Sequence, residues 1–238
     1  MSRGEVRQSD RGRVGQEIVS GGSLLLYPVP ILRHPVGRNG AMLEIRFHGR
    51  GGQGTVVATI LLSKAFFDAG YFVQSFPLFG VERRGAPVEA YLRIDSREIR
   101  LHTNVYTPDH VVVLDHTLLQ GTDVTHGLKP QGWIILNAPC SPSRIERYCG
   151  FQLAFVDAAR IALKHQLGTR THPIVNTAMM GALARILGMP PMDAIARAIE
   201  EEIGGRHEDN TRAAQDAYEE VRLLGLIQSP QATMGNAQ

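Results

Sequence analysis

The sequence predicts an α/β fold, namely a three-layer α/β/α domain with a mostly parallel, mixed sheet and a Rossmann-like first unit. Short apolar runs of the kind buried in parallel sheets alternate with helical patterns along the chain. The first strand pattern runs directly into a glycine cluster and then into a helix. The chain has 238 residues with 43% hydrophobic content, which is enough for one domain with a sizeable core.

The first unit lies in residues 42–88. Residues 43–47 (LEIRF) alternate apolar and polar side chains, which is the period of two typical of a strand. The glycine cluster HGRGGQG follows, and residues 55–69 then contain no Gly or Pro and stop at Gly70, as helices commonly do. We therefore expect a strand, a glycine loop and a buried helix.

The glycine loop is a candidate anion site, because backbone N–H groups and the positive end of a helix dipole meet there. Gly49, Gly51 and Gly54 match the dinucleotide fingerprint, but the acid expected about twenty residues later is missing. The P-loop pattern fails as well, because Thr55 stands where the lysine belongs. The loop is therefore either a ligand cradle or a packing device. We expect a side chain at Gly52 to point to the space above the helix start and one at Gly54 to meet the strand.

The later elements follow from the same patterns. We expect strands at residues 71–76, 88–94, 99–101, 110–114, 132–137 and 151–156. We expect helices from residue 157, at 178–187 with Asn176 and Thr177 capping the first turn, at 192–202 and at 209–224. Asp115 follows strand 110–114 at the carboxyl end, where open α/β sheets bind ligands, or it caps the next turn.

Five separated phrases, in this order, carry a family resemblance: GRGGQG, FPLFGVERRGAPVEAYLRID, VDAARIAL, PIVNTAMMGALARI and NTRAAQDAY. Together they resemble the gamma subunit, or gamma domain, of the pyruvate and related 2-oxoacid:ferredoxin oxidoreductases, over about residues 42–222. The resemblance implies oxidative decarboxylation of a 2-oxoacid on thiamine diphosphate, transfer of electrons through iron–sulfur clusters to ferredoxin, and release of an acyl-coenzyme A.

The resemblance also implies a role for this chain in the coenzyme A and subunit-interface region, with no catalytic residue of its own. Thiamine diphosphate, 4Fe–4S clusters and coenzyme A are expected on or with partners, namely thiamine diphosphate-binding alpha and beta subunits and a ferredoxin-like iron–sulfur subunit. The alternative function is a stand-alone nucleotide-binding or NAD-dependent enzyme. The expected cofactor-binding residues are Gly49, Arg50, Gly51, Gly52, Gln53, Gly54, Glu82, Arg83, Arg84, Asn176 and Thr177.

Composition argues against several other functions. Cys140 and Cys149 are too few for a four-thiolate iron–sulfur cluster, and the nine histidines lack the spacing of a metal site. The net charge of +2, without a basic run, argues against nucleic-acid binding. No signal peptide and no apolar run of about 18 residues occur, so a cytoplasmic protein without a membrane span is expected.

Residues 1–41 differ in composition from the rest of the chain. They are polar and rich in Arg and Gly up to residue 22, and residues 23–32 then form an apolar patch that Pro28 and Pro30 interrupt. The segment is either an N-terminal extension that lies along a partner subunit or the product of a misassigned start, and we favour a partner-binding arm at residues 23–41. The gamma-type domain is expected at residues 42–227 and a loose polar tail at 228–238.

Overall fold

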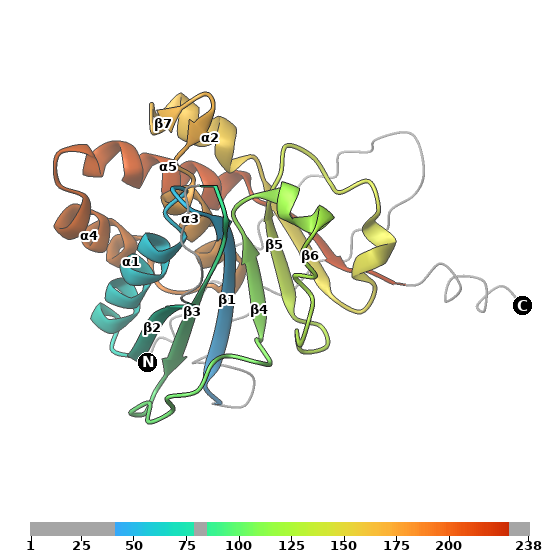
Figure 1. The fold of residues 1–238 in the computed structure, drawn as a ribbon. Coiled ribbons are helices and arrows are strands. Elements are labelled where there is room, and N and C mark those ends of the chain that lie inside the picture. Colours follow the sequence, from blue (N-terminus) through green and yellow to red (C-terminus); the bar gives the residue numbers. More distant parts are fainter. Residues whose placement is uncertain (1–40, 79–84, 229–238) are drawn as a thin grey trace, which may run out of the picture.

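The computed structural model describes residues 41–78 and 85–228, so nearly all of the predicted extension and tail lie outside the described ranges (Figure 1). A seven-stranded sheet has the order β2-β3-β1-β4-β5-β6-β9, and β7 and β8 form a small separate sheet. The strands are β1 (Leu43–Arg50), β2 (Phe72–Leu78), β3 (Pro87–Asp95), β4 (His110–Val113), β5 (Trp133–Asn137), β6 (Gln152–Val156), β7 (Gly168–Thr169), β8 (His172–Pro173) and β9 (Arg222–Leu226).

The longest helices of the described ranges, α1 and α5, have 14 residues each. No helix in these ranges is long and apolar enough to cross a membrane. The helices are α1 (Thr55–Asp68), α2 (Ala158–Lys164), α3 (Asn176–Leu187), α4 (Met192–Ile203) and α5 (His207–Glu220), with the 3-10 helices η2 (His116–Gln120), η3 (Ile145–Tyr148) and η4 (Gly204–Arg206).

Strand β1 lies where the sheet changes direction. It pairs in parallel with β4 and antiparallel with β3. The parallel part continues through β5 to β6, whereas β2 and β9 are antiparallel strands at the two ends of the sheet. The predicted α/β class with a mixed sheet is therefore confirmed. Helix α1 connects β1 to β2, but β3 lies between these two strands in the sheet.

One face of the sheet is covered by helices, and α1 to α5 all contribute side chains to the core there (Figure 1). Ile45 and Phe47 of β1 face this core and are fully buried with Leu61 and Phe66 of α1. Helices α3 and α5 approach each other closely at Gly181, where a Cβ atom would lie 1.8 Å from the Ala214 carbonyl oxygen. The close contact between these two helices requires glycine at this position.

The opposite face is covered by η2, η3 and the connections around them. Val111 and Val113 of β4 pack there against Val124 and Tyr148 in a smaller core. Toward β1 the same face is polar, and Arg46 donates hydrogen bonds to carbonyl oxygens of the covering segment at residues 124 and 126. This layer is therefore fastened by polar side chains of the sheet as well as by apolar contacts.

Two of the expected elements are wrong, and a third is too short. Residues 99–101 form no strand, because their segment is a loop whose Leu101 carbonyl accepts hydrogen bonds from Gln74 and Arg93. The helix expected at 209–224 ends at residue 220, and the chain continues as β9, whose backbone pairs with β6. Strand β2 includes Pro77 rather than stopping before it, which fits its place at the edge of the sheet.

Candidate functional site

The glycine loop lies at the carboxyl end of β1, at the point where the connections of the sheet diverge. From the carboxyl end of β1 the chain leads through α1 to β2 on one side of the sheet. From the carboxyl end of the neighbouring β4 it leads through η2 to β5 on the other side. Asp115 follows the end of β4 at the same edge. Open α/β sheets bind ligands at such a switch point. We therefore take the loop at residues 49–54, together with Asp115, as the candidate site.

The conformation of the loop requires glycine at two positions. Gly52 and Gly54 have φ angles of 95° and 78°, in the region that L side chains rarely adopt. A Cβ atom at Gly54 would also lie 2.7 Å from Asn176 Nδ2. A side chain at Gly54 would therefore meet α3, and the expectation that it faces the strand is wrong.

Packing restricts the start of the loop as well. A Cβ atom at Gly49 would lie 2.0 Å from Thr55 Oγ1, across the turn that joins β1 to α1. Thr55 is buried, and its hydroxyl has no hydrogen-bond partner in the described part of the chain. The helix can start this close to the strand only because Gly49 has no side chain.

Asp115 fixes the glycine loop. Its Oδ2 accepts hydrogen bonds from Arg50 Nε and Gln53 Nε2, both at 3.0 Å, and its Oδ1 accepts from Thr117 N and Oγ1 at 2.9 and 2.6 Å. Burial alone would raise the pKa of Asp115, but the hydrogen bonds from Thr117 and Gln53 and the charge of Arg50 together lower it. The ionised carboxylate thus joins the ends of β1 and β4, and the predicted capping role of Asp115 is confirmed at η2.

The start of α1 carries no negative charge and no capping side chain. Its N-cap residue is Gly54, which offers no capping side chain, and the first turn contains no acidic residue. Helix N-termini of this kind attract anions through free N–H groups and the helix dipole. Arg50 is engaged elsewhere, because it also donates to Gly85 O and Thr117 Oγ1. An anion above the loop would therefore contact backbone N–H groups before the Arg50 guanidinium.

The charged loop after β2 joins the chain beside the glycine loop. Glu82, Arg83 and Arg84 themselves lie outside the described residues. The two residues that follow them are described, and both contact the glycine loop: Gly85 N donates to Gly51 O at 3.0 Å, and Gly51 N donates to Ala86 O at 2.9 Å. Two segments more than thirty residues apart in sequence are thus joined at this edge of the sheet.

Asn176 and Thr177 lie in the first turn of α3 and are both buried. Asn176 Oδ1 accepts a hydrogen bond from Thr177 N at 2.9 Å, but the N-cap residue of α3 is Val175, so Asn176 lies inside the helix and its expected capping role is wrong. Thr177 does not cap, because its hydroxyl donates to Asn210 Oδ1 of α5 at 3.0 Å. Asn176 adjoins the loop at Gly54, whereas Thr177 joins two helices of the core.

A dinucleotide site would need a different arrangement of strands. The acid that binds the ribose belongs at the end of the second strand, which lies beside β1 in dinucleotide-binding folds, but here the antiparallel β3 separates β2 from β1. Strand β2 (FVQSFPL) contains no acidic residue. The geometry therefore gives no support to the NAD alternative.

The described ranges also contain no group of three or more His, Cys, Asp or Glu side chains that could hold a metal ion. Cys140 and Cys149 are exposed and unpaired. Two separate thiols do not fit an iron–sulfur cluster, which needs four ligands.

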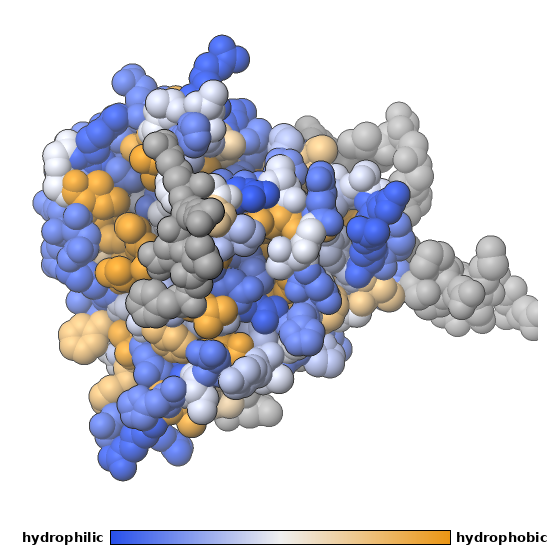
Figure 2. All heavy atoms as spheres, viewed as in Figure 1, coloured by the Kyte–Doolittle hydropathy of each residue, from blue (hydrophilic) through white to orange (hydrophobic). Residues whose placement is uncertain are grey.

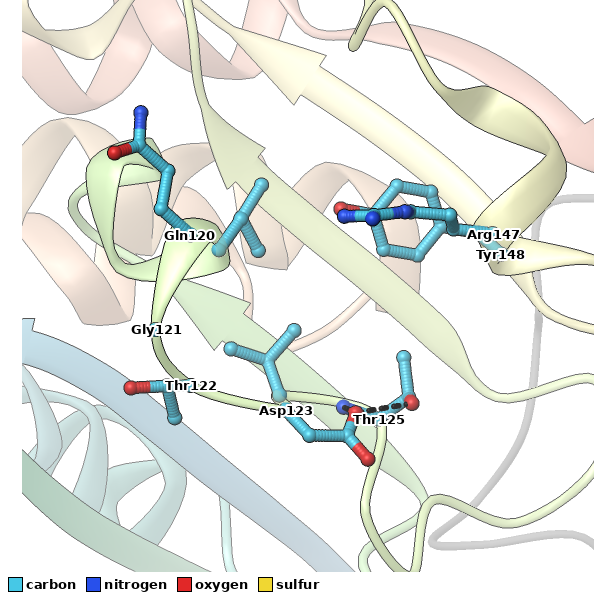
Figure 3. Close-up of a pocket in the computed structure, with 9 residues that line it drawn as sticks. Gln120, Gly121, Thr122, Asp123, Thr125, Arg147 and Tyr148 are labelled. Atoms are coloured by element: carbon cyan, nitrogen blue, oxygen red, sulfur yellow. Dashed lines mark hydrogen bonds between the residues drawn. The ribbon is translucent and has the colours of Figure 1, made fainter.

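A separate pocket of about 290 Å³ lies on the face opposite the α-helices (Figure 3). The side chains of Arg147 and Tyr148 extend from η3 toward residues 119–125, while the Asp123 carboxylate is bonded to Thr125. Arg147 and Asp123 bring opposite charges to the rim, and none of the predicted site residues lines the pocket. The pocket is therefore distinct from the candidate site.

Thr117 is a residue of the site that the sequence did not predict, although its hydroxyl accepts a hydrogen bond from Arg50. A signal for it exists in the sequence, because Asp-x-Thr at residues 115–117 recurs at 123–125. In both places the carboxylate accepts hydrogen bonds from the N–H and the hydroxyl of the threonine two residues on.

The family model for pyruvate ferredoxin/flavodoxin oxidoreductase matches residues 44–220. The "Pyruvate/ketoisovalerate oxidoreductases common subunit gamma" of Pyrococcus furiosus is 48% identical over 189 residues, which cover 78% of this chain and 100% of that protein.

Two solved structures share the fold. The pyruvate oxidoreductase subunit PORC of Thermotoga maritima has a TM-score of 0.66 at 37% identity, over 76% of this chain and 98% of that one. The 2-oxoglutarate:ferredoxin oxidoreductase of Magnetococcus marinus, solved with 2-oxoglutarate, coenzyme A and succinyl-CoA bound, has a TM-score of 0.59 at 19% identity. The match covers 75% of this chain and 30% of that one, so the fold forms one part of a longer chain there.

Proposed function

Because the chain belongs to the pyruvate ferredoxin/flavodoxin oxidoreductase family, as a gamma subunit of a 2-oxoacid:ferredoxin oxidoreductase complex, we propose that its glycine loop helps form the coenzyme A region at a subunit interface. The complex would decarboxylate a 2-oxoacid oxidatively on thiamine diphosphate, form an acyl-coenzyme A, and pass electrons to ferredoxin or another acceptor. Thiamine diphosphate would be held by alpha and beta subunits, and the iron–sulfur clusters by a ferredoxin-like subunit.

The observation that carries this proposal is the open N-terminus of α1 at the switch point of the sheet. Its first turn has neither a capping side chain nor an acid, and Asp115 holds the preceding loop in one conformation. Coenzyme A carries phosphate groups, which are the natural guests of such a helix start. The fold also occurs in the Magnetococcus marinus enzyme that was solved with coenzyme A, which makes this cofactor the first to test.

Choice of the 2-oxoacid would belong to the partner subunits. The Pyrococcus furiosus relative is named as a subunit common to pyruvate and ketoisovalerate oxidoreductases. A subunit shared between two substrates is suited to a task that both reactions have in common. Handling of coenzyme A is such a task, whereas discrimination between side chains of the acid is not.

Arg83 and Arg84 would bind coenzyme A phosphates or a neighbouring subunit, with Glu82 beside them. They directly precede Gly85, whose N–H donates a hydrogen bond to Gly51 of the glycine loop, so the chain that follows them is attached to the proposed site. Arginine suits this role because its guanidinium group stays charged and binds phosphate through two parallel hydrogen bonds.

The experiment replaces both arginines with alanine in the assembled complex and measures the rate as a function of coenzyme A concentration. We expect a higher KM for coenzyme A or a loss of subunit assembly, with an unchanged melting temperature of the isolated subunit. The double variant of Arg97 and Arg100, two exposed arginines of another loop, is the matched control. Normal assembly together with an unchanged KM in the Arg83/Arg84 variant would reduce this segment to a solvated turn.

A further inference from the structure

Helix α1 is apolar on nearly its whole circumference, although only one side of it faces the core. Its inner residues Leu62 and Phe66 are fully buried. Its outer residues Val57, Ile60 and Phe67 are 43%, 43% and 67% exposed. Helices that are apolar all round are normally buried all round, so α1 has the composition of a helix that is covered on both sides.

The three outer residues form one stripe along the helix, called here the α1 stripe (Val57, Ile60 and Phe67). Their spacing places them on the same side of α1, with Lys64 between them. The Lys64 ammonium group turns toward Glu201 and forms an ion pair with Glu202 of α4, which leaves the stripe without an unpaired charge. Figure 2 shows hydrophobic surface over α1 at the left of the molecule.

We propose that the apolar part of the chain's own N-terminal extension, residues 24–32, packs along the α1 stripe. This segment reads LLLYPVPIL and carries no charged side chain. It is therefore matched in polarity to the stripe, and burial of both surfaces would remove apolar area from water at about 25 cal/mol per Å².

The extension joins the fold close to one end of the stripe. It enters β1 at Leu43, which pairs with Ile94, and Ile94 pairs in turn with Val73 of β2. Two strand spacings put Leu43 about 10 Å from Val73. Strand β2 begins one tight turn after Phe67, where Gly70 N donates to the Phe67 carbonyl. The extension thus emerges near the Phe67 end of the stripe.

The length of the extension allows the contact. Residues 33–42 can span at most about 35 Å when fully extended. Helix α1 has 14 residues and is therefore about 21 Å long. Residues 24–32 can consequently reach every part of the stripe within the same chain.

The prolines favour packing on the helix over addition of a strand to the sheet. Strand β2 is at the edge of the sheet, close to the entry point of the extension. Pro28 and Pro30 have no N–H groups, so they cannot complete a ladder of hydrogen bonds along that edge. Side-chain contact with α1 needs no such ladder.

The lengths of the relatives favour binding of residues 24–32 to this chain over binding to a partner subunit. The Pyrococcus furiosus gamma subunit is matched over its whole length by 78% of this chain. The family model likewise begins only at residue 44. Subunit contacts that the family shares therefore do not depend on residues 1–43, and an arm bound to a partner subunit becomes the alternative outcome of the test.

Disulfide cross-linking tests the proposal in the full chain, alone and in the assembled complex. The first variant carries Leu26→Cys and Ile60→Cys in a Cys140→Ser, Cys149→Ser background. The control carries Leu26→Cys and keeps the native Cys149, which is exposed and directly follows η3, on the face of the sheet opposite the α-helices. We expect mild oxidation to give an intramolecular cross-link in the first variant and none in the control.

Other outcomes overturn the proposal. A covalent dimer would mean that the segment packs on a second copy, and a cross-link to another subunit would assign it to a partner. A cross-link of equal yield in the control would show nonspecific contact. As a second measurement, Leu26→Asp with Val29→Asp should raise the binding of a hydrophobic dye to the chain on the order of twofold, because the stripe is uncovered. Unchanged dye binding would contradict the proposal even if the cross-link formed.

Discussion

Arg50 Nε donates a 3.0 Å hydrogen bond to Asp115 Oδ2 and so ties the glycine loop after β1 to the end of β4. We expect Asp115→Asn to cost about 1–2 kcal/mol of unfolding free energy, because a charge-assisted contact becomes a neutral one. Asp123→Asn is a matched control, because Asp123 has the same threonine turn without the contacts to Arg50 and Gln53. Thermal unfolding of both variants measures the difference, and equal losses would show that the loop does not depend on the carboxylate.

The stability of the fold should depend on pH through His48. This side chain is 3% exposed, and burial lowers its pKa from 6.5 to about 4, against the opposing charge of Glu89. Between these two values the unfolded chain takes up a proton that the folded chain does not, so the free energy of unfolding falls as the pH falls. The full effect is up to about 3 kcal/mol.

His48→Gln should remove most of that dependence, whereas the same change at the exposed His102 should leave it intact. Denaturant unfolding between pH 7 and about pH 4 measures the slope for each variant. A slope that is the same in His48→Gln and in the unaltered chain would assign the acid sensitivity to other groups.

Gly54 should tolerate alanine less well than Gly70 does. Both glycines have positive φ, at 78° and 90°, but only at Gly54 would the Cβ atom meet a neighbour, Asn176 Nδ2 at 2.7 Å. We expect about 1 kcal/mol for Gly70→Ala and about 2–3 kcal/mol for Gly54→Ala, measured by thermal unfolding. Asn176→Ala removes the amide group but keeps the Cβ atom at 3.2 Å, so Gly54→Ala should cost less in the Asn176→Ala background than in the unaltered chain. An equal cost in both backgrounds would contradict the contact.

Arg93 is expected to be among the polar residues on which the fold depends most. It is 1% exposed and donates to Glu44 and Gln74 and to carbonyl oxygens of the loop at residues 101 and 104. Arg93→Ala should cost about 3–5 kcal/mol, because Glu44 would be left without its buried partner. Arg100→Ala, which breaks an exposed pair with Glu98, should change stability by less than about 1 kcal/mol. Comparable losses in the two variants would show that burial does not set the difference.

The isolated subunit should contain no iron and no thiamine diphosphate. Its two cysteines do not fit a cluster, and its sequence has no GDG-type thiamine diphosphate signature. Elemental analysis and mass spectrometry of the chain expressed without partners check this prediction. Stoichiometric iron would contradict it, and a tightly bound dinucleotide would restore the NAD alternative.

The sequence predicted those parts of the fold that depend on local patterns. The helix from Thr55 and the buried strand at residues 110–113 could be predicted, because the apolar spacing and the glycines that indicate them lie within one short segment each. Strand β9 was missed because residues 222–226 continue the pattern of α5, and only pairing with β6 makes them a strand. Residues 99–101 looked like a strand, but the loop there is held by Arg93 from another element.

In the candidate site, too, the parts set by local sequence were predicted and the contacts between distant segments were not. The glycine loop was found from its residues, whereas the bonds of Arg50 and Gln53 to Asp115 join positions 65 and 62 residues apart. No local pattern predicts which carboxylate such side chains will reach. The neighbour of Gly54 was assigned to the wrong element for the same reason, since α3 starts more than a hundred residues later.

Both ends of the sheet are poor templates for fibril growth. Strand β2 contains Pro77, which has no N–H group to offer a further strand, and β9 pairs with β6 through a register shift between Leu153 and Ala154. Irregular edges of this kind prevent copies of a protein from stacking strand on strand into aggregates. Edge-to-edge pairing between copies of this chain is therefore disfavoured at both ends of the sheet.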